Sequence, residues 1–294
     1  MQRPYFIHAL SPLHPGTGQA QGAIDLPIAR LRGTGIPYLP GSSVKGVLRD
    51  AHTGRKTGQE PEKDILTDVF GPPVNMDKDD TRHSGAVAFG DARLLALPVR
   101  SFYGTFAWVS SPLLLRLARR DLSWSHGIPE PSTKGRCGAA GVAKDTVLSI
   151  GDYIFLEEIE CQVDASETIQ TLVQKWADDL AKLAFPDDAE LFTERFAVVD
   201  DETMTFLWEC CTQVDARVRI NEHGAVQEGA LWYEESLPAE TLLLGVAVVI
   251  KRDEKPERFL DFCLGEERVD LQFGGKATVG RGRARLVPVR GEKI

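Results

Sequence analysis

The sequence predicts an α+β fold, because strand-like and helix-like segments are interleaved without a regular strand–helix–strand repeat. The strand-like segments are short apolar runs or runs that alternate apolar and polar residues, and one long segment has the spacing of an amphipathic helix. Long stretches rich in glycine, proline and polar residues separate them and predict insertions. A chain of 294 residues fits one large domain with insertions, or two smaller domains.

The first half of the chain is predicted to alternate short strands with loops. Residues 36–39 precede Pro40 and Gly41, after which Ser42 or Ser43 is placed to cap a helix. The other expected elements, in chain order, are a strand at 5–10, loops at 11–22, 53–64 and 72–85, strands at 85–97 and 102–109, a short basic helix at 112–121 and a loop at 125–145.

The second half carries the clearest periodic signals. Apolar residues at helical spacing predict a helix at 166–184. Apolar residues alternate with Asp215, Arg217 and Arg219 before a turn at 221–224, which predicts a β-hairpin at 214–233. An apolar, β-branched run predicts a central strand at 242–250, and a closing segment follows at 284–289.

Charge is distributed unevenly along the chain. The net charge of −9 argues against a simple basic nucleic-acid-binding protein. However, residues 25–58 carry six Lys/Arg against two Asp/Glu, and residues 268–294 carry seven against two, whereas residues 150–210 carry three against sixteen. The acidic segment fits a solvated face; alternatively, it keeps RNA off that surface or meets a basic neighbouring subunit.

The cysteines and the apolar segments indicate the cellular compartment. Cys137, Cys161, Cys210, Cys211 and Cys263 form no C-x-x-C pair. No apolar run approaches the roughly 20 residues of a membrane span, and the apolar stretch near the N-terminus is too short for a signal peptide. We therefore expect reduced thiols in a cytoplasmic protein, without a disulfide framework, a zinc site or a membrane partner.

Two segments, 14–50 and 274–286, combine glycines with basic residues and small hydroxyls. Glycine lets a phosphate approach the backbone, and Lys and Arg neutralise its charge. In the first segment, helix N–H groups, two serine hydroxyls and Lys45 could meet one phosphate; an ordinary helix cap with an exposed lysine is the alternative. The second segment carries Lys276 and Arg281; its alternative is a glycine-rich turn between strands. The spacing of Gly41 and Gly46 fails as a P-loop, because Val47 stands where the lysine belongs.

His14 and Asp25 are the residues of the first segment that could perform chemistry. Asp25 lies between Ile24 and Leu26, followed by Pro27, and these neighbours would hold it rigidly. A fixed carboxylate can recruit a divalent cation or orient a ribose hydroxyl. The alternative is an ordinary turn or surface residue.

Motifs along nearly the whole chain resemble the RAMP-superfamily backbone subunits of type III-B CRISPR (Cmr) effector complexes. The segments that carry the resemblance are LSPLHPGTG, IDLPIAR, GIPYLPGSSVKGVLRD, FGPP, GDARLLALPVRSFYGTFAWVSSPLLL, GALWYEESLPAETLL and GGKATVGRGRARL. The resemblance implies a single RAMP domain over 1–294, with a discontinuous, ferredoxin/RRM-like palm and finger and thumb insertions. It places a finger-type insertion at 51–85, an insertion region with an acidic helix at 125–213 and the thumb at the 214–233 hairpin, with 125–165 as a second thumb candidate.

The same resemblance implies partners and an activity. Copies of the chain would stack along a guide RNA (crRNA), beside other Cmr subunits, and cleave complementary single-stranded target RNA at regular intervals. The implied catalytic residues are Asp25, His14 and Glu234, with Glu235 an alternative to Glu234. The implied RNA-binding residues are Ser42, Ser43, Lys45, Arg49, Lys276 and Arg281.

The implied mechanism is in-line attack of a ribose 2′-hydroxyl on the neighbouring phosphate, which leaves a cyclic phosphate and a 5′-hydroxyl. Asp25 would orient that hydroxyl or bind Mg²⁺ or Mn²⁺, as in a metal-dependent endoribonuclease. His14 would act as an acid, a base or a support for the backbone. Two alternatives remain open at this point: a guide-binding scaffold without nuclease activity, and a guide-processing endoribonuclease of the same superfamily.

Overall fold

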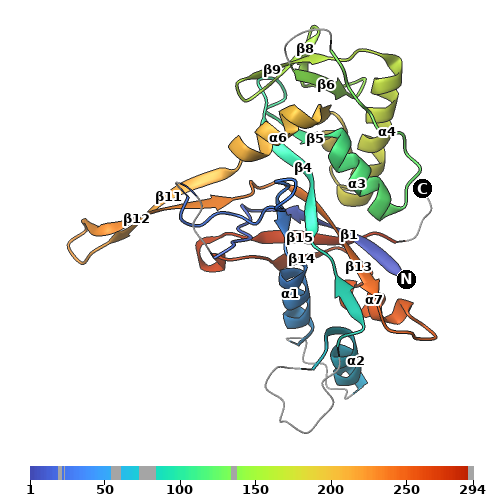
Figure 1. Ribbon diagram of the computed structural model, residues 1–294, viewed down its shortest axis with the longest axis vertical. Helices are drawn as coiled ribbons and strands as arrows, with labels where there is room; N and C mark the ends of the chain where they lie inside the picture. The colour runs from blue at the N-terminus through green and yellow to red at the C-terminus, as the bar shows by residue number, and fades with distance from the viewer. Residues whose placement is uncertain (19–21, 23, 54–60, 73–83, 134–137, 291–294) are drawn as a thin grey trace.

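The computed structural model describes residues 1–18, 22, 24–53, 61–72, 84–133 and 138–290. One large mixed sheet runs along the long axis of the molecule, with helices packed at both ends (Figure 1). Over the described residues its strand order is β14-β15-β1-β13-β4-β5-β10-β6-β9-β8-β7, with β2 beside β4 and β3 beside β13. The α+β prediction is confirmed.

The lower part of the sheet joins the two ends of the chain, because β1 pairs with both β13 and β15. Tyr5, Phe6 and Ile7 are fully buried in β1, as expected for a strand covered on both faces. The elements of this part are β1 (Gln2–Ala9), β2 (Tyr38–Leu39), α1 (Gly41–Thr53), α2 (Pro61–Phe70), β3 (Val87–Phe89), β4 (Ala92–Arg100), β13 (Leu242–Val249), α7 (Glu257–Leu264), β14 (Val269–Gln272), the 3-10 turn η1 (Ala277–Val279) and β15 (Arg283–Pro288).

The upper part contains most of the acidic segment and has a second core, centred on the buried Trp108, Trp176 and Phe192. Its two longest helices have serine caps: Ser111 accepts from the N–H of Leu114, and Ser166 from that of Ile169. The elements are β5 (Phe106–Ser110), α3 (Pro112–Leu122), β6 (Gly138–Val142), β7 (Ser149–Ile150), β8 (Tyr153–Leu156), β9 (Ile159–Val163), α4 (Glu167–Ala184), α5 (Ala189–Thr193), β10 (Phe196–Val199) and α6 (Asp201–Cys210).

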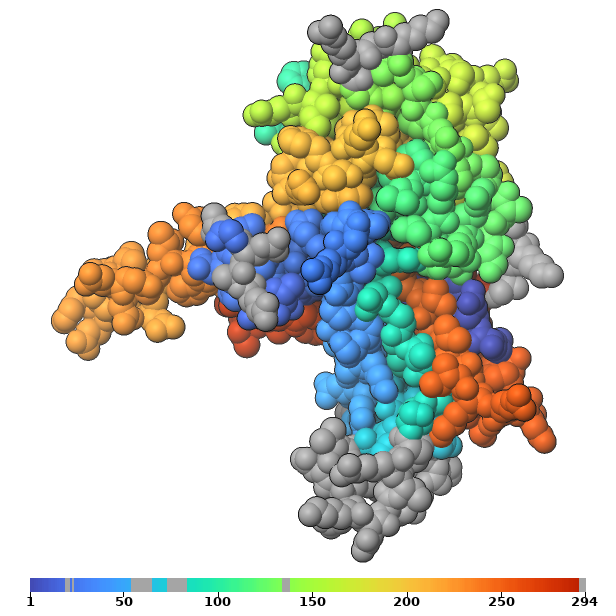
Figure 2. Space-filling model, in the orientation of Figure 1, coloured from blue at the N-terminus to red at the C-terminus, as the bar shows by residue number. Residues whose placement is uncertain are grey.

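A separate two-stranded hairpin, β11 (Gln213–Ile220) and β12 (Val226–Ser236), projects from the side of the body (Figures 1 and 2). Its antiparallel register, with Ala216 opposite Tyr233 and Val218 opposite Leu231, confirms the predicted hairpin. The apolar face of the arm is exposed, whereas Asp215 and Arg217 on the other face are half-buried. The assignment of this arm as the thumb, like the other insertion boundaries, stays a prediction.

Several predicted boundaries were wrong. The predicted strand 85–97 is interrupted at Gly90, which separates β3 from β4. The predicted strand 102–109 begins at Phe106, because Gly104 and Thr105 have positive φ angles. The expected loop at 125–145 contains β6, and the one at 53–64 contains the start of α2. Most of the loops predicted at 53–64 and 72–85 lies outside the described residues.

Helix α1 begins at Gly41, so neither Ser42 nor Ser43 is its cap. The Gly41 N–H donates to Asp91 Oδ1 at 2.9 Å. A Cβ atom on residue 41 would lie 2.1 Å from the carbonyl oxygen of Phe89, so a glycine lets the helix start closely against the β3–β4 connection. The acceptor at the helix start therefore comes from a distant residue, which local sequence could not indicate.

Candidate active site

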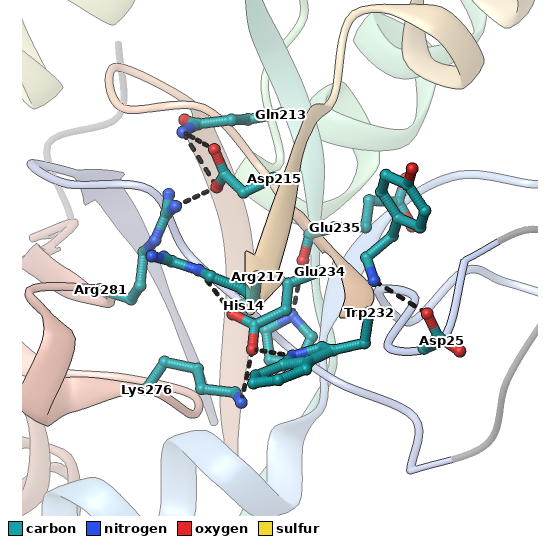
Figure 3. A network of polar contacts seen from close by, with 11 residues as sticks. His14, Asp25, Gln213, Asp215, Arg217, Trp232, Glu234, Glu235, Lys276 and Arg281 are labelled. Carbon is teal, nitrogen blue, oxygen red and sulfur yellow. Dashed lines mark hydrogen bonds and ion pairs between the residues drawn. The ribbon is translucent and has the colours of Figure 1, made fainter. Parts of the chain in front are cut away.

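Three segments that are far apart in the sequence meet at the base of the hairpin (Figure 3). They are the segments 13–18 and 24–30, the end of β12 and the glycine-rich loop between β14 and β15. Leu13 bridges to Leu237, Leu26 bridges to Glu234, and the Gly275 N–H donates to the His14 carbonyl. The structure therefore brings together the predicted residues His14, Asp25, Glu234 and Lys276.

Asp25 is exposed and its position is fixed by the backbone of β12. Its Oδ2 accepts from the N–H of Tyr233 at 2.8 Å. The next residue, Leu26, donates to the Tyr233 carbonyl and accepts from the N–H of Glu235. The Asp25 segment is thus attached to β12 as a short parallel bridge, and it presents an oriented carboxylate to solvent.

His14 is buried, with 6% of its surface exposed. Its Nδ1 lies 2.6 Å from the Glu235 carbonyl oxygen, which can only accept, so Nδ1 carries the proton and donates. A Cβ on Gly16 would lie 2.5 Å from Nε2, so the ring is packed closely against its own loop. Of the three roles expected for His14, this geometry corresponds to support of the backbone.

Glu234 is buried, and three side chains bind its carboxylate. Oε1 accepts from Lys276 Nζ and from Trp232 Nε1, each at 2.7 Å, and Arg217 Nε lies 3.5 Å from Oε2. Burial by itself raises the pKa of this carboxyl. The hydrogen bonds from Lys276 and Trp232 and the nearby positive charges lower the pKa by more than burial raises it, so the pKa lies below the ordinary value. Glu234 is therefore ionised at neutral pH and unsuited to act as a general acid.

Glu235 is 2% exposed and points to other partners. Its carboxylate accepts from Arg30 Nη2 at 2.6 Å, Thr212 Oγ1 at 2.8 Å and the N–H of Ile28 at 3.0 Å. Thr212 immediately precedes β11, whereas Arg30 and Ile28 follow Asp25 in the chain. Glu235 thus fastens the Asp25 segment to the base of the hairpin.

The predicted RNA-binding cations of the C-terminal loop are already paired within the protein. Lys276 binds Glu234, and the buried Arg281 forms an ion pair with Asp215. Gly282, with φ of 82°, is required by the loop, because a Cβ there would lie 1.9 Å from the carbonyl oxygen of Phe273. The C-terminal loop is therefore a glycine-rich turn whose cations Lys276 and Arg281 are each paired with a carboxylate of the hairpin.

The predicted RNA-binding residues of α1 lie outside this network. Ser42 is exposed, and Ser43, Lys45 and Arg49 are half-buried. Neither Lys45 nor Arg49 forms an ion pair with a carboxylate of the described chain. The N–H groups of Ser43 and Val44 both donate to the Pro40 carbonyl, so fewer first-turn donors are free for a phosphate than the sequence implies.

Sequence reasoning gave no role to four residues that shape the site: Arg30, Thr212, Asp215 and Arg217. Asp215 and Arg217 were recognised only as the polar positions of the hairpin alternation. Arg30 lies within the IDLPIAR motif, but its partner Glu235 is 205 residues away. The polar alternation of the hairpin was the signal that could have indicated Asp215 and Arg217, whereas no local pattern indicated the contacts of Arg30 and Thr212.

Asp25 is the site residue that could bind a divalent cation. No group of three or more His, Cys, Asp or Glu side chains suited to a metal occurs among the residues that the structure describes. Mg²⁺ commonly takes one or two protein carboxylates, with water and substrate phosphates as its other ligands. The single exposed carboxylate of Asp25 fits a cation shared with RNA, and it does not form a metal site of the protein alone.

Comparison with known proteins identifies the family. The model of the RAMP superfamily matches residues 6–285. The chain belongs to the RAMP superfamily. This RAMP chain is 34% identical to the CRISPR system Cmr endoribonuclease Cmr4 of Pyrococcus furiosus, over 94% of the chain and 92% of that relative. It is 22% identical to the CRISPR system CMR subunit Cmr4 of Saccharolobus solfataricus, over 97% of the chain and 95% of that protein.

Solved structures share the fold of this RAMP chain. Oligomeric Cmr4 from Pyrococcus furiosus aligns with a TM-score of 0.74 and 27% identity, covering 98% of this chain and 99% of the other. A chain of a type III-B Cmr-β complex bound to cognate target RNA aligns with a TM-score of 0.73 and 21% identity, covering 98% and 97%. Within the described residues, no helix is long and apolar enough to cross a membrane.

Proposed function

We propose that this chain is the guide-RNA-binding backbone subunit of a type III-B CRISPR ribonucleoprotein. Copies of it assemble along the crRNA, beside other subunits of the effector complex, and each copy cleaves complementary single-stranded target RNA. The similarity to the Cmr endoribonuclease Cmr4 over nearly the whole chain supports the class of complex. The single observation that carries the activity is the exposed Asp25 carboxylate, which Tyr233 holds at the base of a projecting hairpin.

In the proposed reaction, the 2′-hydroxyl oxygen attacks the neighbouring phosphorus and loses its proton to solvent water, which also supplies the proton for the leaving oxygen. The bond from phosphorus to the 5′-oxygen breaks, and the leaving oxygen takes up a proton, which gives a cyclic phosphate and a 5′-hydroxyl. Asp25 accepts the hydrogen bond of the attacking hydroxyl and aligns it. His14 and Glu235 position the backbone that carries Asp25, and Glu234 holds the cations beside it.

A divalent cation, Mg²⁺ or Mn²⁺, would be held by Asp25 together with oxygens of the RNA. When bound, it would offset negative charge that develops at the phosphate. The proposed metal dependence has its own measurement. Cleavage by the assembled complex should stop on chelation and return on addition of Mg²⁺, while target binding persists.

Guide binding is assigned to the first turns of α1. Lys45 and Arg49 are cations without a carboxylate partner in the described structure, and Ser42 and Ser43 lie beside them. Such groups bind the RNA backbone whatever the base sequence. The hairpin β11–β12 projects from the body and is the proposed thumb, which distorts the target strand at intervals.

The deciding experiment is target cleavage by the complex carrying Asp25→Asn. The amide keeps the size of the side chain but removes its charge, so we expect guide assembly and target binding to persist while cleavage falls at least about a hundredfold. Asp145→Asn, at an exposed aspartate of the upper part, is the matched control and should cleave normally. Normal cleavage by Asp25→Asn would favour the scaffold-only function instead.

A target with 2′-deoxyribose at the scissile positions gives an independent test. The unmodified complex should bind this target but leave it uncut, because the attacking hydroxyl is missing. Cleavage of the deoxy target would rule out the proposed attack by the 2′-oxygen.

A further inference from the structure

Trp232 differs from the other tryptophans of the chain in its exposure. The chain has five tryptophans, and four of them are at most 8% exposed: Trp108, Trp124, Trp176 and Trp208. Trp232 is half-buried on β12, in the arm that projects from the body. An indole that belongs to no core presents part of its aromatic surface to solvent.

The ring of Trp232 is held in one orientation. Its Nε1–H donates to Glu234 Oε1 at 2.7 Å, and Glu234 is in turn held by Lys276 and Arg217. Because a protein carboxylate satisfies the polar atom of the indole, the aromatic faces are the part left to bind a ligand. Figure 3 shows the ring extended beside Lys276 and Glu234.

The charges around this ring favour an anionic ligand. One carboxylate, Glu234, faces two cations, Lys276 and Arg217, which leaves one positive charge in the group. Arg217 lies directly opposite Trp232 in the hairpin register. Tyr233, the next residue of β12, holds Asp25 through its N–H, so the ring and the proposed cleavage site are carried by the same short stretch of strand.

We propose that Trp232 is a stacking subsite for an unpaired nucleobase of bound RNA. Every base has a π-face, so an aromatic platform with neighbouring cations binds single-stranded RNA with little sequence preference. A base stacked on a fixed ring also orders the strand on either side of it, which helps to align the target at the proposed cleavage site. This subsite rests on the proposed function, because it supplies an anchor for the RNA strand at the cleavage step.

Fluorescence of the chain assembled on guide RNA tests stacking directly. The difference in emission between wild type and Trp232→Phe isolates Trp232. We expect this component to be quenched when the base stacks, and to become protected from acrylamide. Three kinds of sample are compared: the chain with guide RNA alone, with guide and target RNA, and with guide and a series of targets. Each target of the series carries one abasic nucleotide, at a different position. Quenching by guide alone identifies a guide base; quenching that needs target and is lost at one abasic position identifies a target base.

Substitutions test the energetic role of the ring. Trp232→Phe keeps an aromatic face and should retain most RNA affinity, whereas Trp232→Leu should weaken binding about tenfold, within the range known for one stacked base. Phe102→Leu, at an 81% exposed aromatic of the upper part, is the matched control and should bind normally. Circular dichroism and urea unfolding check that each variant is folded.

Two results would overturn the subsite: Trp232 emission that responds to neither RNA, or a folded Trp232→Leu variant that binds as tightly as wild type. If the wild-type complex still cuts target in that case, the proposed function stands and only the subsite falls. If the guide-loaded wild type cuts no target, the nuclease function itself falls, whatever the fluorescence.

Discussion

The start of α1 and the loop before β15 are both rich in glycine and basic residues, yet they hold their cations differently. Lys45 and Arg49 on α1 have no carboxylate partner in the described part of the chain. Lys276 and Arg281 in the loop are paired with Glu234 and Asp215 on the hairpin. In the sequence, both segments have the composition of a phosphate-binding loop.

The difference lies in what each segment contacts. Helix α1 presents its cations to solvent, so they are available to RNA phosphates. The loop packs against the polar face of the hairpin, and its cations offset the buried Glu234 and the half-buried Asp215. Composition therefore indicates where positive charge lies, whereas only the fold determines whether that charge is already used. Four substitutions test this comparison.

The largest effect is expected from Gly282→Ala in the loop. A Cβ there would lie 1.9 Å from the Phe273 carbonyl oxygen, and φ is 82°. Strain and overpacking together should lower the free energy of unfolding by about 3 kcal/mol or more. Urea unfolding, with soluble yield as a second measure, reports the loss.

The matched change in the other segment is Gly46→Ala. A Cβ at this helical position meets nothing within 4 Å, so we expect a gain of about 0.5–1 kcal/mol. Equal effects at the two glycines would contradict the distinction between a packed loop and an open helix surface.

An intermediate effect is expected when the pairing of Lys276 is removed. Lys276→Met leaves the buried Glu234 with Arg217 as its cation and the Trp232 N–H as its donor, and should cost about 2 kcal/mol at pH 7. The pKa of Glu234 is lowered in the folded state, so the stabilisation is present above the unfolded pKa of about 4.3 and is lost as the pH falls through the folded value. The stability gap between wild type and variant should therefore close in acid; a constant gap would exclude this ion pair as its cause.

The smallest effect concerns guide affinity. Lys45→Ala should lower the salt slope of guide binding by about one unit, for all spacer sequences alike. The ratio of the variant's dissociation constant to that of the wild type should then be about threefold larger at 50 mM than at 200 mM salt. Lys276→Met should change the slope less, because Glu234 already balances that charge. Filter-binding titrations measure the slopes. A larger change in slope for Lys276→Met than for Lys45→Ala would contradict the proposed difference between the two segments.

Local pattern predicted elements whose signal repeats over many residues. The hairpin and the helix α4 were found almost to their ends, because alternation and helical spacing reflect which face is covered. The extra strand β6 and the break at Thr105 were missed, because β6 is defined by its partners β9 and β10, and the turn depends on positive φ angles. The rigidity of Asp25 was predicted, but its cause, the N–H of Tyr233, is 208 residues distant.

For Glu234 and His14, the catalytic roles implied by the resemblance stay predictions, and the structure adds contacts that the sequence could not indicate. A histidine and a glutamate near a phosphate site are typical of acid–base catalysis, but here they bind a carbonyl and two cations. Burial and partner identity decide between these roles, and both depend on contacts between distant segments. The resemblance implied these site residues, and the structure shows that Asp25 is exposed whereas His14 and Glu234 are buried.

The bond from the Gly275 N–H to the His14 carbonyl has a consequence for synthesis of the protein. During translation His14 and Asp25 emerge from the ribosome first, whereas Gly275 and Lys276 emerge only after β13 and β14 have been made. Until then Glu234 has no lysine partner, and the loop that packs against His14 does not exist. A truncated chain thus cannot complete this site. A chain truncated before Gly275 would therefore differ in its folded structure from the longer chain, even before any RNA is bound.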